Sequence, residues 1–355
     1  MIRNLQSLRF VFIMLVVMSH IIGKSFDFGG ECGVSFFFML SGFILSYAYG
    51  EQVAARTFRH SRFLLKQLAK FYPLHVLMFF IMVLMDARLG RFFGWDQLIA
   101  QLLLLQSWVP SDDFYFIANG SSWFLSDLLF FYAVFPFVYL LLMRLHLRSL
   151  VMSALVVTAL YALLVLQIPE GMINPLLYAA PWTRLLDFSI GILVFRFYVS
   201  NASSSFNSWL GRQSGSVVTF MELALSLTLV ASFFVYEHAS LRFRCAALFW
   251  LVLPLVLYFF VVSDNKTGSV TKLLHHSVLQ WLGSISLEIF LVHWATMRLL
   301  YSGIAIFRGD EEVRLSLAVV LLTLAVICVV SYLTKRFFVT PVYTHLLQRI
   351  NNKVL

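Results

Sequence analysis

One arginine and one histidine lie in the first apolar segment of the chain, where charge and imidazole are costly. Arg9 and His20 stand eleven residues apart in the stretch LRFVFIMLVVMSHIIGK, residues 8–24. On a helix this spacing is close to three turns, roughly 16 Å of rise, so both side chains share one face. A histidine is well suited to move protons near neutral pH, and an arginine keeps its charge. The pair predicts proton transfer at His20 with a fixed positive charge three turns away.

A purely structural interpretation of Arg9 and His20 is also open. Arg9 could reach the membrane surface and act only as a topology anchor, while His20 makes a polar contact between helices. The spacing by itself does not separate the two interpretations.

A second candidate site is the basic segment that follows the second apolar stretch. Four cations recur there at intervals of 3, 4 and 4 residues, namely Arg59, Arg62, Lys66 and Lys70. This spacing places them on one face of a helix. A cationic face next to a membrane can bind lipid phosphates or the phosphates of a soluble cofactor presented from the cytosol.

Further polar side chains lie inside other apolar segments, where ionisable groups usually pair or serve function. They are Asp127 in SSWFLSDLLFFYAVFP, Arg184 and Asp187 in PWTRLLDFSIGILV, and Ser286, Glu288 and His293 in LQWLGSISLEIFLVHW. Arg184 and Asp187 are three residues apart, and mutual neutralisation is the interpretation we favour for them. Ser286 and His293 are two helical turns apart, so they either face one cavity or hydrogen-bond to a neighbouring helix.

Composition assigns the whole chain to the membrane. Of its 355 residues, 61% are hydrophobic and 12% charged, and the mean hydropathy is +0.86, against roughly a quarter charged in soluble domains. The longest polar stretches, such as 200–216 and 264–276, have the length of loops. We expect a single membrane domain, 1–355, without an appended soluble domain. The three cysteines are far apart in the sequence, so neither a metal site nor a disulfide framework is predicted.

The apolar segments predict an all-α, polytopic fold of about ten transmembrane helices. The segments are 5–23, 31–50, 71–88, 121–143, 150–168, 177–199, 217–237, 244–263, 279–301 and 314–334. A shorter apolar stretch at 95–109 suits a helix at the membrane interface. Ten crossings place both termini on one side, together with 17 of the 26 lysines and arginines. The positive-inside rule makes that side the cytoplasm, and the net charge of +9 is then a topology signal rather than a sign of nucleic-acid binding.

Several of these stretches together resemble the membrane acyltransferase 3 family, whose members transfer acyl groups to cell-surface and other carbohydrates. The resemblance covers nearly the whole chain and begins with the arginine and histidine at positions 9 and 20. It continues, in the family's usual order, with GGECGVSFFFMLSGFILS (29–46), the basic segment ending in KFYP, SWFLS…FFYAVFP, RLLDFSIGIL and WLGSISLEIFLVH. Each motif is weak by itself, whereas their order is specific.

Some positions differ from the family pattern. The family usually has two arginines three apart before its loop proline, and the matching positions here are Gln67 and Lys70. A glutamate often follows the motif tryptophan, here Trp123, by five residues; that position is Leu128, with Asp127 beside it. The family's cofactor contacts in the basic segment are therefore not matched residue by residue, and Asp127 does not simply inherit the role of the glutamate.

The resemblance implies an integral-membrane O-acyltransferase that moves an acyl group, with acetyl expected, from acyl-coenzyme A (acetyl-CoA) to a hydroxyl of a cell-surface glycan or glycolipid. It implies that His20 is the catalytic residue, and imidazole chemistry suggests a general base that takes the proton of the attacking hydroxyl. Arg9 would help to hold the donor or orient the site. The phosphates of coenzyme A would meet the cations of the basic segment, Arg59, Arg62, Lys66 and Lys70. Direct transfer and an acyl-histidine intermediate both stay open.

Two other classes of protein share part of this pattern. A proton-coupled transporter or flippase of a glycan or lipid would use His20, Asp127, Glu288 and His293 as a relay, but the sequence shows no internal repeat. A purely structural scaffold leaves Arg9 and His20 unexplained. We therefore expect a multi-pass enzyme of the inner (cytoplasmic) membrane of a bacterium, in contact with membrane lipid and without a metal ion. Its oligomeric state is open.

Overall fold

The computed structural model describes residues 2–23, 29–308 and 315–352, and every regular element in these ranges is helical. A helix satisfies the backbone hydrogen bonds of a membrane segment internally, as the absence of water in the bilayer requires. The α-helices are α1 (Arg3–Ile22), α2 (Gly30–Ala54), α3 (His60–Arg88), α4 (Trp95–Leu102), α5 (Asp112–Tyr115), α6 (Trp123–Arg144), α7 (Leu147–Gln167), α8 (Pro181–Tyr198), α9 (Asn201–Leu210), α10 (Gly215–His238), α11 (Val252–Val262), α12 (Ser269–Leu274), α13 (Ser277–Ser284), α14 (Ser286–Arg308), α15 (Leu317–Thr334) and α16 (Thr340–Asn352).

The predicted all-α, polytopic fold is confirmed. Within the described ranges, 8 helices are long and apolar enough to cross a membrane, and they include α1, α2, α3, α6, α7, α10, α14 and α15. The pair α8 and α9 is a ninth candidate, bent by 72° at the break between the two helices.

The predicted crossing at 244–263 is shorter than the sequence suggested. It consists of short 3₁₀ turns followed by α11, which has only 11 residues. Pro254 lies in the first turn of α11. Its missing backbone N–H costs little there, because the first N–H groups of a helix have no partner within the helix.

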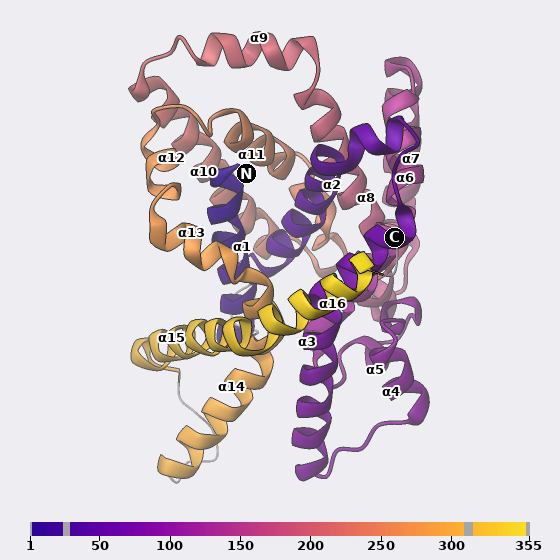
Figure 1. Cartoon of the computed structure of the whole chain (residues 1–355), viewed down its shortest axis with the longest axis vertical. Helices are drawn as coiled ribbons and strands as arrows, with labels where there is room; N and C mark the ends of the chain where they lie inside the picture. The colour runs from indigo at the N-terminus through magenta and orange to yellow at the C-terminus, as the bar shows by residue number, and fades with distance from the viewer. Residues whose placement is uncertain (1, 24–28, 309–314, 353–355) are drawn as a thin grey trace.

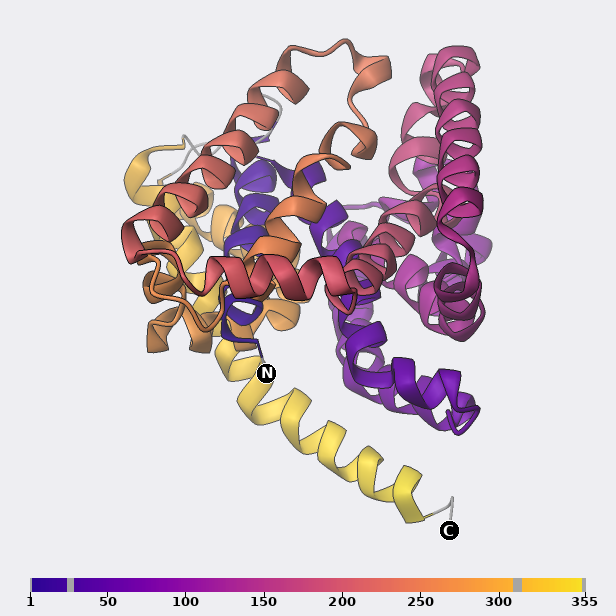
Figure 2. The same ribbon diagram turned by 90° about the horizontal axis from the view of Figure 1, so that it is seen from above.

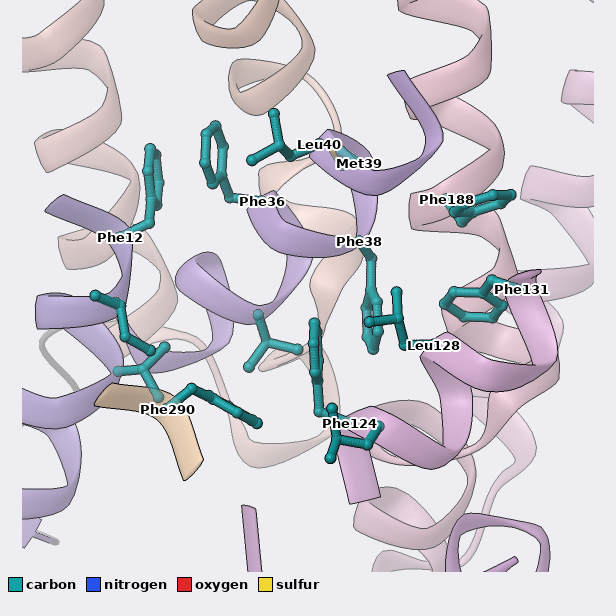
Figure 3. Close-up of a cluster of buried hydrophobic side chains, with 14 of the residues drawn as sticks. Phe12, Phe36, Phe38, Met39, Leu40, Phe124, Leu128, Phe131, Phe188 and Phe290 are labelled. Carbon is teal, nitrogen blue, oxygen red and sulfur yellow. The ribbon is translucent and has the colours of Figure 1, made fainter. Parts of the chain in front are cut away.

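Helices α1 and α2 lie in the middle of the bundle. Figure 2 shows them between α6 and α7 on one side and α14 and α15 on the other. Phenylalanine rings pack along this centre, with Phe12 of α1 stacked on Phe36 of α2 at 3.7 Å and Phe38 of α2 on Phe124 of α6 at 4.4 Å between centroids. Figure 3 shows these rings in one continuous cluster. The motif-bearing helices thus form the core around which the remaining helices pack.

Two glycines bring α2 and α8 into close contact. A Cβ atom added at Gly42 would overlap the carbonyl oxygen of Phe188, and one added at Gly191 would overlap the carbonyl oxygen of Met39. Small residues allow helix backbones to approach closely in a membrane, where van der Waals packing drives association. The glycine of the SGF motif at 41–43 is therefore a packing residue.

The connecting segments lie at two opposite ends of the bundle, as expected for helices that cross the membrane in alternating directions. Figure 1 shows α9 at one end and the C-terminal ends of α3 and α14 at the other. A cytoplasmic position of both termini stays a prediction from the basic residues. Of those residues, Lys24, Arg314 and Lys353 lie outside the described ranges.

Candidate active site

His20 meets a second histidine from a distant part of the sequence. His20 lies in the last turn of α1, and His293 lies two turns into α14. The Nδ1 atom of His20 and the Nε2 atom of His293 are 2.9 Å apart, and the two rings are nearly parallel with centroids at 5.0 Å. Sequence analysis singled out both residues but could not detect their contact, which joins positions 273 residues apart.

The backbone of α14 determines which nitrogen of each ring carries a proton. Nδ1 of His293 lies 2.7 Å from the carbonyl oxygen of Phe290, and a carbonyl oxygen only accepts. Nδ1 of His293 therefore donates, which leaves Nε2 of the neutral ring as an acceptor. His20 must then donate from Nδ1. The lone pair of a neutral His20 is consequently on Nε2, the nitrogen needed for a base.

The side chain of His20 lines a cavity of about 420 Å³, which we call the outer cavity. Its size falls in the range of about 300–1,000 Å³ typical of small-molecule sites. Three large aromatic side chains contribute to its wall, Trp123, Tyr178 and Trp294. His293 lies behind His20, is fully buried and does not line this cavity. Of the two histidines, His20 is the one that can reach a ligand there.

An ion pair that sequence analysis missed also lines the outer cavity. Oδ1 of Asp86 on α3 and Nη2 of Arg298 on α14 are 2.7 Å apart. Asp86 is buried, whereas Arg298 is partly exposed. In the sequence, each residue is only a charged position toward the end of an apolar segment. The 212 positions between them hide the contact. The outer cavity therefore combines aromatic faces with hydrogen-bonding groups.

Arg9 lines a second and narrower cavity of about 110 Å³, which we call the inner cavity. Lys70 of α3, Tyr132 of α6 and Ser286 of α14 contribute to the same wall. Arg9 and His20 thus face cavities inside the bundle, as their shared helical face predicts. Ser286 and His293 do not share a cavity, because His293 is turned toward His20 and closed off from the inner cavity.

The two cations of the inner cavity, Arg9 and Lys70, have no direct partner among the described residues. Within the described part of the chain, neither Arg9 nor Lys70 makes a hydrogen bond or a salt bridge. Two like charges facing one space attract an anion to it.

The basic segment leads along α3 toward this inner cavity. Arg59 precedes the helix as its N-cap residue and is exposed, so the predicted helical face holds for the other three cations. Arg62 donates from Nη2 to Oδ1 of Asn351 at 2.9 Å, and Figure 1 shows α16, which carries Asn351, crossing α3. Lys66 is half-buried and does not line the inner cavity. Lys70 is the cation of this segment that lines it.

Arg184 belongs to a fully buried ion cluster. Its Nη1 lies 3.1 Å from Asp187 Oδ2, which confirms the favoured pairing. A second carboxylate, Glu31 of α2, lies 2.6 Å from Nη2 and was not foreseen. Trp250 donates its indole N–H to Asp187 at 2.6 Å, and the guanidinium lies 5.9 Å from the ring of Trp123. Arg184 thus links α2 and α8 beneath the outer cavity wall.

The remaining polar candidates do not join the histidine pair. Asp127 is fully buried, and neither of its carboxylate oxygens has a hydrogen-bond partner in the described structure. Glu288 is buried too, and its Oε2 likewise has none there. Of the four residues that a transporter relay would require, His20, Asp127, Glu288 and His293, the described structure joins His20 and His293 alone by a hydrogen bond.

The acyltransferase 3 family, described as an acyltransferase domain, matches residues 2–336. The chain belongs to this family. A relative, Acyltransferase MdmB of Streptomyces mycarofaciens, is 29% identical over 286 residues, which are 76% of this chain and 68% of the relative. No solved structure matches the chain. The protein is a membrane acyltransferase, which decides between the enzyme and the transporter hypotheses in favour of the enzyme.

Proposed function

We propose that this acyltransferase moves an acyl group, with acetyl expected, from acyl-coenzyme A in the inner cavity to a hydroxyl of a glycan or glycolipid in the outer cavity. The observation that carries the proposal is the position of Arg9 and His20. They lie on one face of α1, with Arg9 in the inner cavity and His20 in the outer cavity. The helix thereby holds a cation on the donor side and a base on the acceptor side.

The donor assignment rests on the unpaired cations. Arg9 and Lys70 face one narrow space without a partner among the described residues, and phosphate groups form strong charge-assisted hydrogen bonds with such side chains. The inner cavity, about 110 Å³, has room for a chain rather than for a nucleotide. The nucleotide of coenzyme A would remain toward Arg59 and Lys66, while its flexible arm leads the thioester toward His20.

The acceptor assignment rests on the lining of the outer cavity. Trp123, Trp294 and the Asp86–Arg298 pair offer flat apolar faces next to charged hydrogen-bonding groups. A sugar presents the matching surface, with C–H groups on its faces and hydroxyls around its edge. These four residues would hold the acceptor with one hydroxyl near Nε2 of His20.

The proposed reaction uses His20 twice. Its Nε2 takes the proton of the acceptor hydroxyl while the oxygen attacks the thioester carbonyl carbon. The tetrahedral intermediate then expels the sulfur of coenzyme A, which takes that proton back from His20, so that an O-ester and a free thiol are released. His293 accepts the hydrogen bond from Nδ1 of His20 throughout and thereby stabilises the protonated ring of His20.

Membrane lipid is a further proposed partner. The spans of α7 and α10 are each only 11% buried within the bundle and are strongly apolar, as lipid-facing helices are. A glycolipid acceptor could reach the outer cavity from the membrane. We propose the inner membrane of a bacterium as the location, on the basis of the family's role in modifying surface carbohydrates.

The test is acyl transfer by the purified full chain with His20→Ala. Labelled acetyl-coenzyme A and a membrane glycan extract serve as substrates, and loss of the base is expected to lower the rate by about 10²–10⁴-fold. His238→Ala, at an exposed position in the last turn of α10, is the matched control and should keep the wild-type rate. Full transfer by His20→Ala would overturn the catalytic role. Failure of the wild type to bind acetyl-coenzyme A would overturn the donor assignment.

A further inference from the structure

One aromatic residue is common to the walls of the two cavities. Phe290 lines both the outer cavity, with His20, and the inner cavity, with Arg9. Its ring lies 5.0 Å from the ring of Phe124, which also lines the inner cavity. Figure 3 shows the Phe290 side chain of α14 pointing across the interior toward Phe124 of α6. An acyl group that moves from the inner cavity toward His20 therefore meets the ring of Phe290, with Phe124 beside it.

The two rings are supported by packing on the far side. Phe124 stacks on Phe38 with centroids 4.4 Å apart and meets the edge of Phe37 at 6.4 Å. Phe124 and Phe290 are each only 7% exposed. Close packing leaves a ring in such a position little room to move without displacing its neighbours.

We propose that Phe290, together with Phe124, selects the donor by the length of its acyl chain. The inference rests on the proposed function, because it assumes an acyl-coenzyme A in the inner cavity. An acetyl group adds one methyl beyond the carbonyl carbon and fits beside the rings. Each further methylene must displace Phe290 or Phe124 from its packed position. Short acyl groups are therefore transferred and long ones are excluded.

The Phe290 side chain can be changed without removing the hydrogen bond that orients the histidines. His293 donates to the backbone carbonyl of Phe290 rather than to its ring. A substitution at this position keeps that carbonyl. The effect of the ring on chain length can thus be measured separately from the effect of the histidine pair on catalysis.

The experiment measures the dissociation constants of acetyl-, butyryl- and hexanoyl-coenzyme A for the purified full chain. One methylene in an apolar pocket changes discrimination by about 10–200-fold, so the wild type should bind acetyl-coenzyme A at least about 10-fold more tightly than hexanoyl-coenzyme A. Phe290→Ala should reduce this ratio to about 3-fold or less, and Phe290→Leu should give an intermediate ratio. Phe290→Trp should weaken butyryl-coenzyme A further.

The matched control is Phe131→Leu. Phe131 is fully buried on α6, packs on Phe188 and lines neither cavity. Its replacement should lower thermal stability but keep the wild-type ratio of affinities. An unchanged ratio in folded Phe290→Leu would overturn the inference and leave the proposed function in place. Absence of any acyl-coenzyme A binding by the wild type would overturn both.

Discussion

Arg184 and Arg9 both lie within the membrane bundle, and their surroundings differ completely. Arg184 is fully buried between two carboxylates, at 2.6 Å from Glu31 and 3.1 Å from Asp187. Arg9 lines the inner cavity and, within the described residues, makes neither a hydrogen bond nor a salt bridge. One guanidinium is neutralised by the fold, while the charge of the other is left facing a cavity.

The difference separates a structural charge from a charge available to a ligand. A buried ion pair mainly makes the arrangement of its helices specific, because removal of one partner leaves an uncompensated charge. An unpaired cation in a membrane interior is costly in the absence of a binding partner. Arg184 accordingly belongs to the α2–α8 contact, and Arg9 belongs to the proposed donor site.

The largest effect is expected for Arg184→Met. Loss of the guanidinium leaves the carboxylates of Glu31 and Asp187 buried without its positive charge. Breaking a buried ion pair in this way costs about 3–5 kcal/mol of folding free energy. Thermal unfolding in detergent, with the amount of protein that accumulates in the membrane, measures this loss. Arg9→Met is the control and should unfold within a few degrees of the wild type. Equal destabilisation by both substitutions would contradict the distinction between the two arginines.

A smaller effect is expected for Arg9→Lys. Lysine keeps the charge but loses the planar fork that grips a phosphate or a carbonyl at two points. Charge-assisted hydrogen bonds contribute about 1.5–3 kcal/mol, so affinity for acetyl-coenzyme A should fall roughly 10- to 100-fold. Titration of the purified protein with acetyl-coenzyme A measures it. Wild-type affinity in Arg9→Lys would mean that Arg9 serves only as a topology anchor.

The smallest effect distinguishes two neighbouring lysines. Lys70 lines the inner cavity and Lys66 does not. Lys70→Gln should weaken binding of coenzyme A by about 10-fold, the equivalent of one charge-assisted bond. Lys66→Gln, one helical turn away, should change the affinity by less than about 3-fold, because Lys66 would meet the nucleotide outside the inner cavity, where water screens the interaction of its charge with a phosphate. The same loss in both variants would indicate a diffuse cationic face that attracts any phosphate.

Much of the architecture could be predicted from apolar segments. Most of the expected crossings correspond to helices of sufficient length, because a bilayer admits only segments that satisfy their own backbone. The exception, 244–263, has enough apolar residues to span, but its helix α11 has only 11 residues. Hydropathy counts apolar residues and does not register where a helix begins.

The candidate site was predictable only in part. Arg9 and His20 were found because both lie on one helix, where spacing determines the shared face. The partners Glu31, Asp86 and Arg298 were missed as partners, because each pairs with a residue on another helix. Sequence separation carries no information about such contacts.

The sequence by itself determined that this chain is an all-helical membrane protein and that Arg9 and His20 share a face of α1. Both follow from local rules, the length of an apolar segment and the pitch of a helix. Only the tertiary structure decided that His293 orients His20, that Arg184 but not Arg9 is paired with carboxylates among the described residues, and that Phe290 lines both cavities. These features depend on side chains from helices far apart in the sequence, and their distances arise only when the helices pack.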